Sequence, residues 1–166
     1  MALSHLIFMR HAKSSWDNPQ LDDHARPLDA RGRAAADRMA RELHARAMAP
    51  DLIWTSDARR TRETAERLMR ALPGPQSVVR VPEFYGASAR QVMHHLSEAA
   101  EPEGRLLLLG HNPGWQALVA LYGGKARKMP TGAALVLKRQ FDSGAVWWRP
   151  ESWTGCLFLE PKRLEP

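Results

Sequence analysis

The feature that most constrains the fold is an apolar run at residues 6–9 that stops abruptly at Arg10 and His11. Strands buried on both faces of a parallel sheet appear in a sequence as short, continuous apolar runs of this kind. A strand that ends in two nitrogen-rich side chains presents them at the carboxyl edge of the sheet, where open α/β folds bind their ligands. Taken alone, such a pair more often marks only a strand that ends at the surface, so other segments must decide.

Strand-like and helix-like segments alternate along the chain as far as residue 122. Residues 3–9, 52–54 and 106–109 predict strands, and residues 78–81 are a candidate short strand. Between them, apolar residues recur every three or four positions, as on the buried face of a helix, in four segments: 29–48, 61–72, 88–99 and 112–123. This alternation predicts a three-layer α/β/α fold with a mostly parallel central sheet.

Several residues are expected to begin or end these helices. Ser56 or Asp57 is the predicted N-cap of the second helix, because a short polar side chain can accept an unpaired backbone N–H there. Residues 73–75, Pro-Gly-Pro, are expected to end that helix. Ser88 and Gln91 form a capping-box pattern, which predicts the start of the third helix.

The pattern changes to strand-like segments from residue 133. Residues 134–139 and 145–149 predict two strands joined by a turn at 141–144, and residues 156–159 predict a last strand. We expect these strands to extend the sheet. The chain of 166 residues has no internal repeat or low-complexity segment, which predicts a single domain over residues 1–166.

Composition excludes several classes of protein. Hydrophobic residues make up 44% and charged residues 25%, which is typical of a globular rather than a disordered chain. No apolar run approaches the roughly 20 residues of a membrane span, and the N-terminus lacks the pattern of a signal peptide. The single cysteine, Cys156, cannot form an internal disulfide. We therefore expect a cytoplasmic protein that does not contact membranes.

The net charge of +6 favours anionic partners, so nucleic acid has to be considered. The basic residues are scattered beside acids on predicted helix faces, and no basic run is interleaved with aromatic residues. We therefore expect no nucleic-acid partner. We also expect no metal site, because the adjacent His94 and His95 would point in different directions from a helix.

Three loops that follow predicted strands should meet at one edge of the sheet: Arg10-His11, residues 56–60, and His111-Asn112. Two histidines and at least two arginines would then converge. A neutral imidazole can attack phosphorus, and arginine side chains match the oxygens of a phosphoryl group. Neighbouring guanidinium charges also lower the pKa of a histidine and so keep it neutral. This convergence predicts a site for phosphoryl transfer.

Four segments resemble the histidine phosphatase superfamily, which has the phosphoglycerate-mutase-like fold. Arg10-His11-Ala12 resembles the Arg-His-Gly/Ala signature of that family. Residues 56–65, SDARRTRETA, are similar to its Ser-Pro-x-x-Arg-Ala-x-Gln-Thr-Ala segment and align its second arginine with Arg60. Residues 110–112, Gly-His-Asn, resemble the second-histidine motif. Residues 23–28, DHARPL, resemble the Arg-Pro-Leu segment of the small SixA branch of phosphohistidine phosphatases.

The resemblance implies a covalent mechanism that needs no cofactor. His11 would be the nucleophile and would become transiently phosphorylated. Arg10, Arg60 and His111 would complete the phosphate pocket, and Arg26 would add a contact from the polar, turn-rich stretch at 12–28. A loop of that length is usually functional or mobile.

Two positions depart from the family pattern. Asp57 stands where the family has proline and would place a negative charge near the pocket. Glu83 is the nearest match to the glutamate that donates a proton in larger members, although it lies one residue closer to Gly86 than expected. The imidazole leaving group of a phosphohistidine departs more readily than an alkoxide and needs less assistance from an acid.

Three functions follow from these residues. The first is a phosphatase that acts on protein phosphohistidine, for which a histidine-phosphotransfer protein is the expected kind of partner. The second is hydrolysis of a small phosphomonoester, which a true acid at Glu83 would favour. The third is a noncatalytic module that binds anions through its basic surface. The presence of both the arginines and the histidines of the predicted site argues against this third function.

Overall fold

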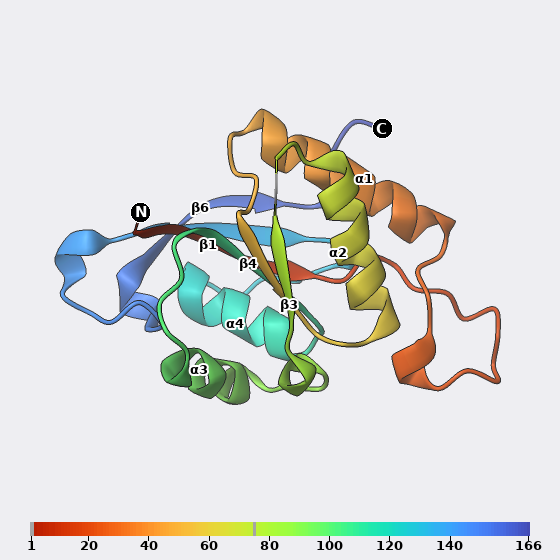
Figure 1. The fold of residues 1–166 in the computed structure, drawn as a ribbon, viewed down its shortest axis with the longest axis horizontal. Helices are drawn as coiled ribbons and strands as arrows, with labels where there is room; N and C mark the ends of the chain where they lie inside the picture. The colour runs from red at the N-terminus through yellow and green to blue at the C-terminus, as the bar shows by residue number, and fades with distance from the viewer. Residues whose placement is uncertain (1, 75) are drawn as a thin grey trace.

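The computed structural model describes residues 2–74 and 76–166, which form a six-stranded sheet with helices on both faces (Figure 1). Pro75, expected in the turn after the second helix, lies outside the described residues. The strands are β1 (Leu3–Arg10), β2 (Leu52–Thr55), β3 (Ser77–Arg80), β4 (Gly104–Gly110), β5 (Ala134–Arg139) and β6 (Trp153–Leu159). The helices are α1 (Ala30–Ala45), α2 (Arg59–Ala71), α3 (Ala89–Glu98) and α4 (Gly114–Gly123). The predicted three-layer α/β architecture is confirmed.

The sheet is mostly parallel, as predicted. Its strand order is β3-β2-β4-β1-β5-β6, and the first four of these strands run parallel to one another. Strand β5 pairs antiparallel with both β1 and β6. Strand β4 lies between β1 and β2, which explains its continuous apolar run because both of its faces are covered.

Successive side chains of the central strands point to opposite faces of the sheet. In β1, Leu6 and Phe8 pack with residues of α3 and α4, whereas Ile7 and Met9 pack with residues of α1 and α2. All four side chains are fully buried. Figure 1 shows α1 and α2 together on one side of the sheet and α3 and α4 on the other.

The predicted helices are present, with differences at their ends. The second helix begins at Arg59, and neither Ser56 nor Asp57 is its N-cap residue. Ser56 instead accepts a hydrogen bond from the backbone N–H of Ala58 at 3.1 Å, so it stabilises the turn before the helix. The capping box of Ser88 and Gln91 is formed as predicted. None of the helices within residues 2–74 and 76–166 is long and apolar enough to span a membrane.

Met69 and Ala47, apolar residues of the predicted helical segments 61–72 and 29–48, are exposed. Met69 retains 38% of its accessible surface, because the buried stripe of α2 passes through Ala65 and Leu68 instead. Ala47 lies beyond the end of α1 in the left-handed backbone region, with a φ of 58°, where the chain turns toward β2.

The predicted strand at 145–149 is wrong. Strand β5 pairs directly with β6, and the chain between them forms short 3-10 turns, at Phe141–Ser143 and Pro150–Ser152. The segment turns away from the sheet because the Trp147 side chain is buried in the core beside Trp54. Cys156 lies in β6, as the sequence suggests, but its side chain is exposed.

The loop at 12–28 is held at both ends by backbone contacts. The backbone N–H groups of Ser15 and Asp29 donate to the carbonyl oxygens of Pro27 and Lys13, at 2.8 and 3.0 Å. Helix α1 begins immediately after the loop, and its Gly32 lies against the backbone of Lys13. The close approach fixes the first turn of α1 against the chain that leaves β1.

Replacing Gly32 with alanine tests this packing. The added Cβ would lie 2.0 Å from the Lys13 carbonyl oxygen, which forces the backbone apart. We expect the free energy of unfolding, measured by urea denaturation, to fall by about 2–3 kcal/mol. Ala34→Ser, an exposed position of the same helix, is the control and should change it by less than about 0.5 kcal/mol. Equal stability of the two variants would contradict the packing.

Candidate active site

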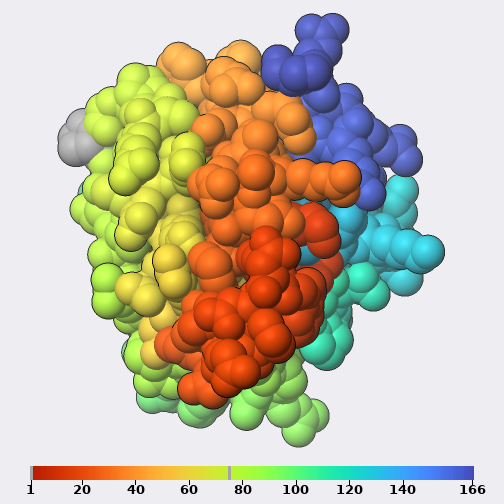
Figure 2. Space-filling model, turned by 90° about the vertical axis from the view of Figure 1, so that its right-hand side faces the viewer, coloured from red at the N-terminus to blue at the C-terminus, as the bar shows by residue number. Residues whose placement is uncertain are grey.

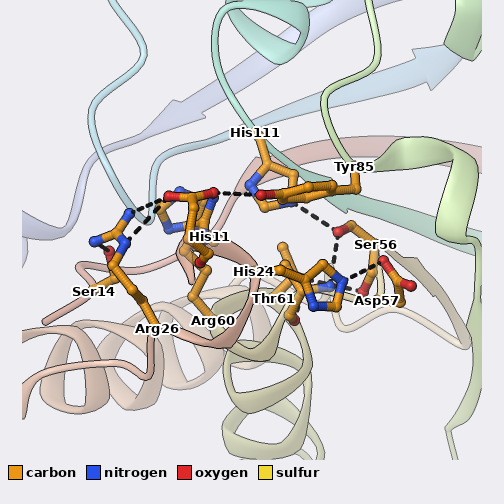
Figure 3. Close-up of polar contacts among 12 residues, drawn as sticks. His11, Ser14, His24, Arg26, Ser56, Asp57, Arg60, Thr61, Tyr85 and His111 are labelled. Atoms are coloured by element: carbon orange, nitrogen blue, oxygen red, sulfur yellow. Dashed lines mark hydrogen bonds and ion pairs between the residues drawn. The ribbon is translucent and has the colours of Figure 1, made fainter. Parts of the chain in front are cut away.

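Loops from the carboxyl edge of the sheet bring together residues that are far apart in the sequence (Figure 3). β1 supplies Arg10 and the following His11, the first turn of α2 supplies Arg60, and His111 follows β4. The loop at 12–28 adds Arg26. All five side chains line one cavity of about 240 Å³. The structure thus places five of the six predicted site residues in a single pocket.

The imidazole ring of His11 is held in a single tautomer. Its ring is 6% exposed, and its Nδ1 lies 2.6 Å from the carbonyl oxygen of Ala12. A carbonyl oxygen can only accept, so Nδ1 carries the hydrogen and donates it. Nε2 therefore keeps its lone pair. The ring of His111 lies nearby, with its centroid 5.2 Å from that of His11.

Both histidines are neutral at physiological pH. Burial lowers the pKa of His11 well below its ordinary value, and the charges of Arg60 and Arg10 lower it further. Burial, together with the charge of Arg60, lowers the pKa of His111 to about 3. A neutral imidazole is the nucleophilic form, so His11 is prepared to attack an electrophile without first losing a proton.

His111 is oriented by Ser56. Its Nε2 lies 2.8 Å from the Ser56 hydroxyl, which also accepts the N–H of Ala58. The hydroxyl has one hydrogen to donate, and when it donates this to Nε2 the hydrogen of His111 is on Nδ1. This Nδ1 is buried and has no hydrogen-bond partner among the described residues. It is therefore available to donate to an oxyanion.

Arg10 and Arg60 also present unpaired donors. One Nη of Arg10 donates to the carbonyl oxygen of Met129 at 3.1 Å. The Nε atoms of both arginines are buried and lack a hydrogen-bond partner within the described chain. Leaving buried donors unpaired is energetically costly. A tetrahedral anion in this pocket would provide the missing acceptors.

Asp23 engages the arginines of the pocket. Its carboxylate lies 2.9 Å from Nη2 of Arg60 and 3.1 Å from Nη2 of Arg26, and it accepts a hydrogen bond of 2.6 Å from the Tyr85 hydroxyl. The Tyr85 hydroxyl and the Arg60 guanidinium hold the pKa of Asp23 well below its usual range. The carboxylate therefore remains ionised and competes with any anion for the arginines.

The sequence interpretation did not assign roles to Asp23, Tyr85 or His24. His24 contacts Asp57 at 2.9 Å and packs edge-on against the Tyr85 ring. Both Asp23 and His24 belong to the DHARPL segment that carries the resemblance, so a signal for them was present in the sequence. Tyr85 had no such signal, because only the fold brings it beside the loop at 12–28.

Glu83 does not lie in this pocket. It belongs to the 3-10 turn Pro82–Phe84, in which Phe84 is fully buried against Trp115. Burial of Phe84 turns the neighbouring Glu83 outward, where it lines a separate cavity with His94. The carboxylate that reaches the candidate site is that of Asp23. Within the described parts of the chain, no three His, Cys, Asp or Glu side chains are grouped as metal ligands would be.

Comparison with known proteins agrees with this geometry. The family model of the histidine phosphatase superfamily (branch 1) matches residues 6–85. This match supports an assignment of the chain to the histidine phosphatase superfamily. An uncharacterised chloroplastic protein of Arabidopsis thaliana is 35% identical over 142 residues, which cover 80% of this chain and 65% of that protein. An uncharacterised protein of Mycobacterium tuberculosis is 34% identical over 111 residues, 66% of each chain. The chain therefore spans 65–66% of the length of these curated relatives.

Solved structures of SixA proteins share the fold. SixA from Agrobacterium tumefaciens matches with a TM-score of 0.78 and 28% identity, over 95% of this chain and 98% of that one. The protein histidine phosphatase SixA complexed with tungstate also gives a TM-score of 0.78, with 22% identity over 95% and 97% of the two chains. This chain therefore has the phosphoglycerate-mutase-like fold in its SixA-like form.

The protonation states can be checked by an NMR titration of the histidine rings. We expect His11 and His111 to remain neutral at pH 5.5, because burial lowers the pKa of each ring. Below about pH 6.5 the unfolded chain then binds protons that the folded chain does not, so the free energy of unfolding falls as the pH drops. For His111 this loss continues down to about pH 3. Protonation of either ring near pH 6.5 would contradict the account.

Asp23→Asn tests the competition between the carboxylate and a bound anion. Removing the negative charge frees Arg60 and Arg26, so we expect orthovanadate to bind about tenfold more tightly in equilibrium titrations. The matched control is Asp22→Asn, an exposed neighbour that should leave the affinity unchanged. Weaker vanadate binding by Asp23→Asn would mean that the carboxylate mainly supports the site rather than competes for it.

Proposed function

We propose that this protein is a phosphatase that hydrolyses protein phosphohistidine through a covalent phosphoryl intermediate on His11. The observation that carries the proposal is the pairing of a neutral His11, whose Nε2 is free to attack, with unpaired donors on three side chains of the same pocket. The match to the superfamily supports it. The SixA structures support the choice of phosphohistidine, and one of them is described as complexed with tungstate, an oxyanion.

In the first step, Nε2 of His11 attacks the phosphorus of the substrate. A bond forms from Nε2 to phosphorus while the bond from phosphorus to the substrate imidazole breaks, and the departing imidazole takes a proton from solvent. Arg10, Arg60 and His111 donate to the oxygens of the transferring group and stabilise its charge. To engage the phosphoryl group in this way, Arg60 exchanges the Asp23 carboxylate for substrate oxygens.

In the second step, water attacks the phosphorus of phosphorylated His11. The bond from Nε2 to phosphorus breaks, inorganic phosphate leaves, and His11 returns to its neutral form with its Nδ1 hydrogen still donated to Ala12. The same donors stabilise the second transition state, because the phosphoryl oxygens occupy the same pocket in both steps. Splitting the hydrolysis in two gives each step a low barrier.

The acid–base groups of the pocket favour phosphohistidine over a phosphomonoester. An alkoxide leaving group needs a proton from a nearby acid, whereas the imidazole of a phosphohistidine leaves readily. The carboxylate beside the pocket, Asp23, has a lowered pKa and is ionised, and Glu83 lines a different cavity. The placement of Glu83 removes the feature that would have favoured the phosphomonoester hypothesis.

His11→Ala is the direct test of the proposed mechanism. We expect the rate of hydrolysis of a phosphohistidine peptide to fall about a thousandfold or more, because the nucleophile is absent. Wild-type enzyme quenched in alkali should carry phosphate on His11, and the variant should carry none. His44→Ala, at an exposed position of α1, is the control for histidine removal. An active His11→Ala variant would overturn the mechanism.

The proposal includes a substrate order and a location. Wild-type protein should hydrolyse the phosphohistidine peptide faster than aryl phosphates, and aryl phosphates faster than sugar phosphates, because leaving-group quality falls in that order. We place the reaction in the cytoplasm. An exposed, unpaired thiol such as Cys156 is compatible with a reducing compartment.

A further inference from the structure

A second cavity adjoins the candidate active site. It has a volume of about 740 Å³ and shares Arg10 and Asn112 with the phosphate pocket. Its other walls come from residues 125–130, which follow α4, and from residues 158–163, at the end of β6 and beyond. Figure 2 shows these segments, in cyan and blue, side by side to the right of the red loop at 12–28.

The walls of this groove are basic. Lys125 and Lys128 are exposed, and Arg127 is half-buried with its guanidinium 4.6 Å from the centroid of the Phe158 ring. Stacking on the ring holds the guanidinium at the surface of the groove. The Nε of Arg127 is buried and has no hydrogen-bond partner among the described residues. A cation held in this way is available to an anionic partner.

The groove contains little negative charge to balance these cations. Among the described residues that line it, the carboxylate is that of Glu160, and it is paired with Arg163 at 3.6 Å. Glu160 therefore does not neutralise Lys125, Arg127 or Lys128.

The positive charge continues past Pro130 and Thr131. A further cavity of about 630 Å³ shares Pro130 with the groove, and shares Lys13 and Thr131 with the phosphate pocket. Nine cationic side chains line these two cavities, and we call six of them the basic rim: Lys13, Arg31, Lys125, Arg127, Lys128 and Lys162. The other three are Arg10 of the phosphate pocket, Arg38, and Arg163, which is paired with Glu160.

The carboxylates near the pocket do not belong to the basic rim. Asp23 comes from the loop at 12–28 and is engaged by Arg60, and Asp57 lies just before α2 and is paired with His24. Charge around the phosphate pocket is therefore asymmetric, with uncompensated cations along the two adjoining cavities.

We infer that the basic rim binds an acidic surface of the protein substrate next to its phosphohistidine. The inference rests on the proposed function and adds the feature that selects the substrate. Two cavities of several hundred Å³ beside the pocket exceed what a single phosphoryl group occupies. Carboxylates spaced along a polypeptide surface can meet cations in both. Such charge complementarity orients the partner and raises the association rate.

Two histidine peptides, phosphorylated chemically with phosphoramidate, provide the test. One has glutamates flanking the histidine, and the other has glutamines at the same positions. At low salt we expect kcat/KM to be about tenfold higher for the glutamate peptide, and at about 0.5 M salt we expect the difference to disappear. Free phosphohistidine, which has no flanking residues, is the reference substrate.

The variant that removes the rim's charge is Lys125→Glu with Lys128→Glu, at two exposed positions outside the phosphate pocket. The matched control is Arg41→Glu with Arg70→Glu, which makes the same change in net charge on exposed positions of α1 and α2. We expect the rim variant to lose the preference for the glutamate peptide and the control to keep it. Both should hydrolyse free phosphohistidine at the wild-type rate.

A preference that survives in the rim variant, or that the control loses equally, would overturn the inference. Binding of the unphosphorylated glutamate peptide, followed by fluorescence anisotropy, tests the rim without catalysis, and its Kd should rise about tenfold in the rim variant. If the protein hydrolyses no phosphohistidine, the proposed function is wrong. The binding measurement still shows whether the basic rim binds an acidic peptide, so the two failures can be told apart. Tighter binding of an RNA oligonucleotide of equal charge would overturn it in favour of nucleic acid.

Discussion

The parallel pairing of β1 with β4 is the interaction on which the candidate site depends. Arg10 pairs with Gly110 at the last position of the two strands, and the N–H of His11 donates to the carbonyl oxygen of Gly110 at 3.0 Å. His11 and His111 are the next residues after this pair, and their side chains line the same pocket. The pairing is rigid because both strands are buried on both faces, and because Gly110 lies directly against the Trp115 ring. A side chain at position 110 would push this ring away from the strand.

Burial and neighbouring charges together set the protonation states of the side chains in the pocket. Burial and the arginine charges keep both imidazoles neutral, and in turn the arginines are partly neutralised by Asp23, which Tyr85 also holds. The result is a pocket in which the Nε donors of Arg10 and Arg60 are unpaired and one Nη of Arg60 binds a carboxylate that substrate can replace. Such a site is organised before substrate arrives, and it gains hydrogen bonds when a phosphoryl group enters.

The sequence predicted most of the architecture because its signals were local. Continuous apolar runs identified β1 and β4, the capping box identified the start of α3, and the rule that parallel strands share a carboxyl edge predicted the convergence of His11 with His111. The failures had non-local causes. Residues 145–149 are mostly apolar, as in a strand, yet the burial of Trp147 takes them away from the sheet. Glu83 follows the motif order, yet the burial of Phe84 turns it outward, and Tyr85 reaches the site only through the fold.

The central claim is that His11 attacks a phosphoryl group held by Arg10, Arg60 and His111. The most direct measurement is a crystal structure with vanadate, which mimics the transferring group by accepting a nitrogen ligand. The account predicts vanadium bonded to Nε2 of His11, oxygens within hydrogen-bond distance of both arginines and of Nδ1 of His111, and the Nδ1 of His11 still bonded to Ala12. Vanadate bonded to another side chain, or located outside this pocket, would contradict the account.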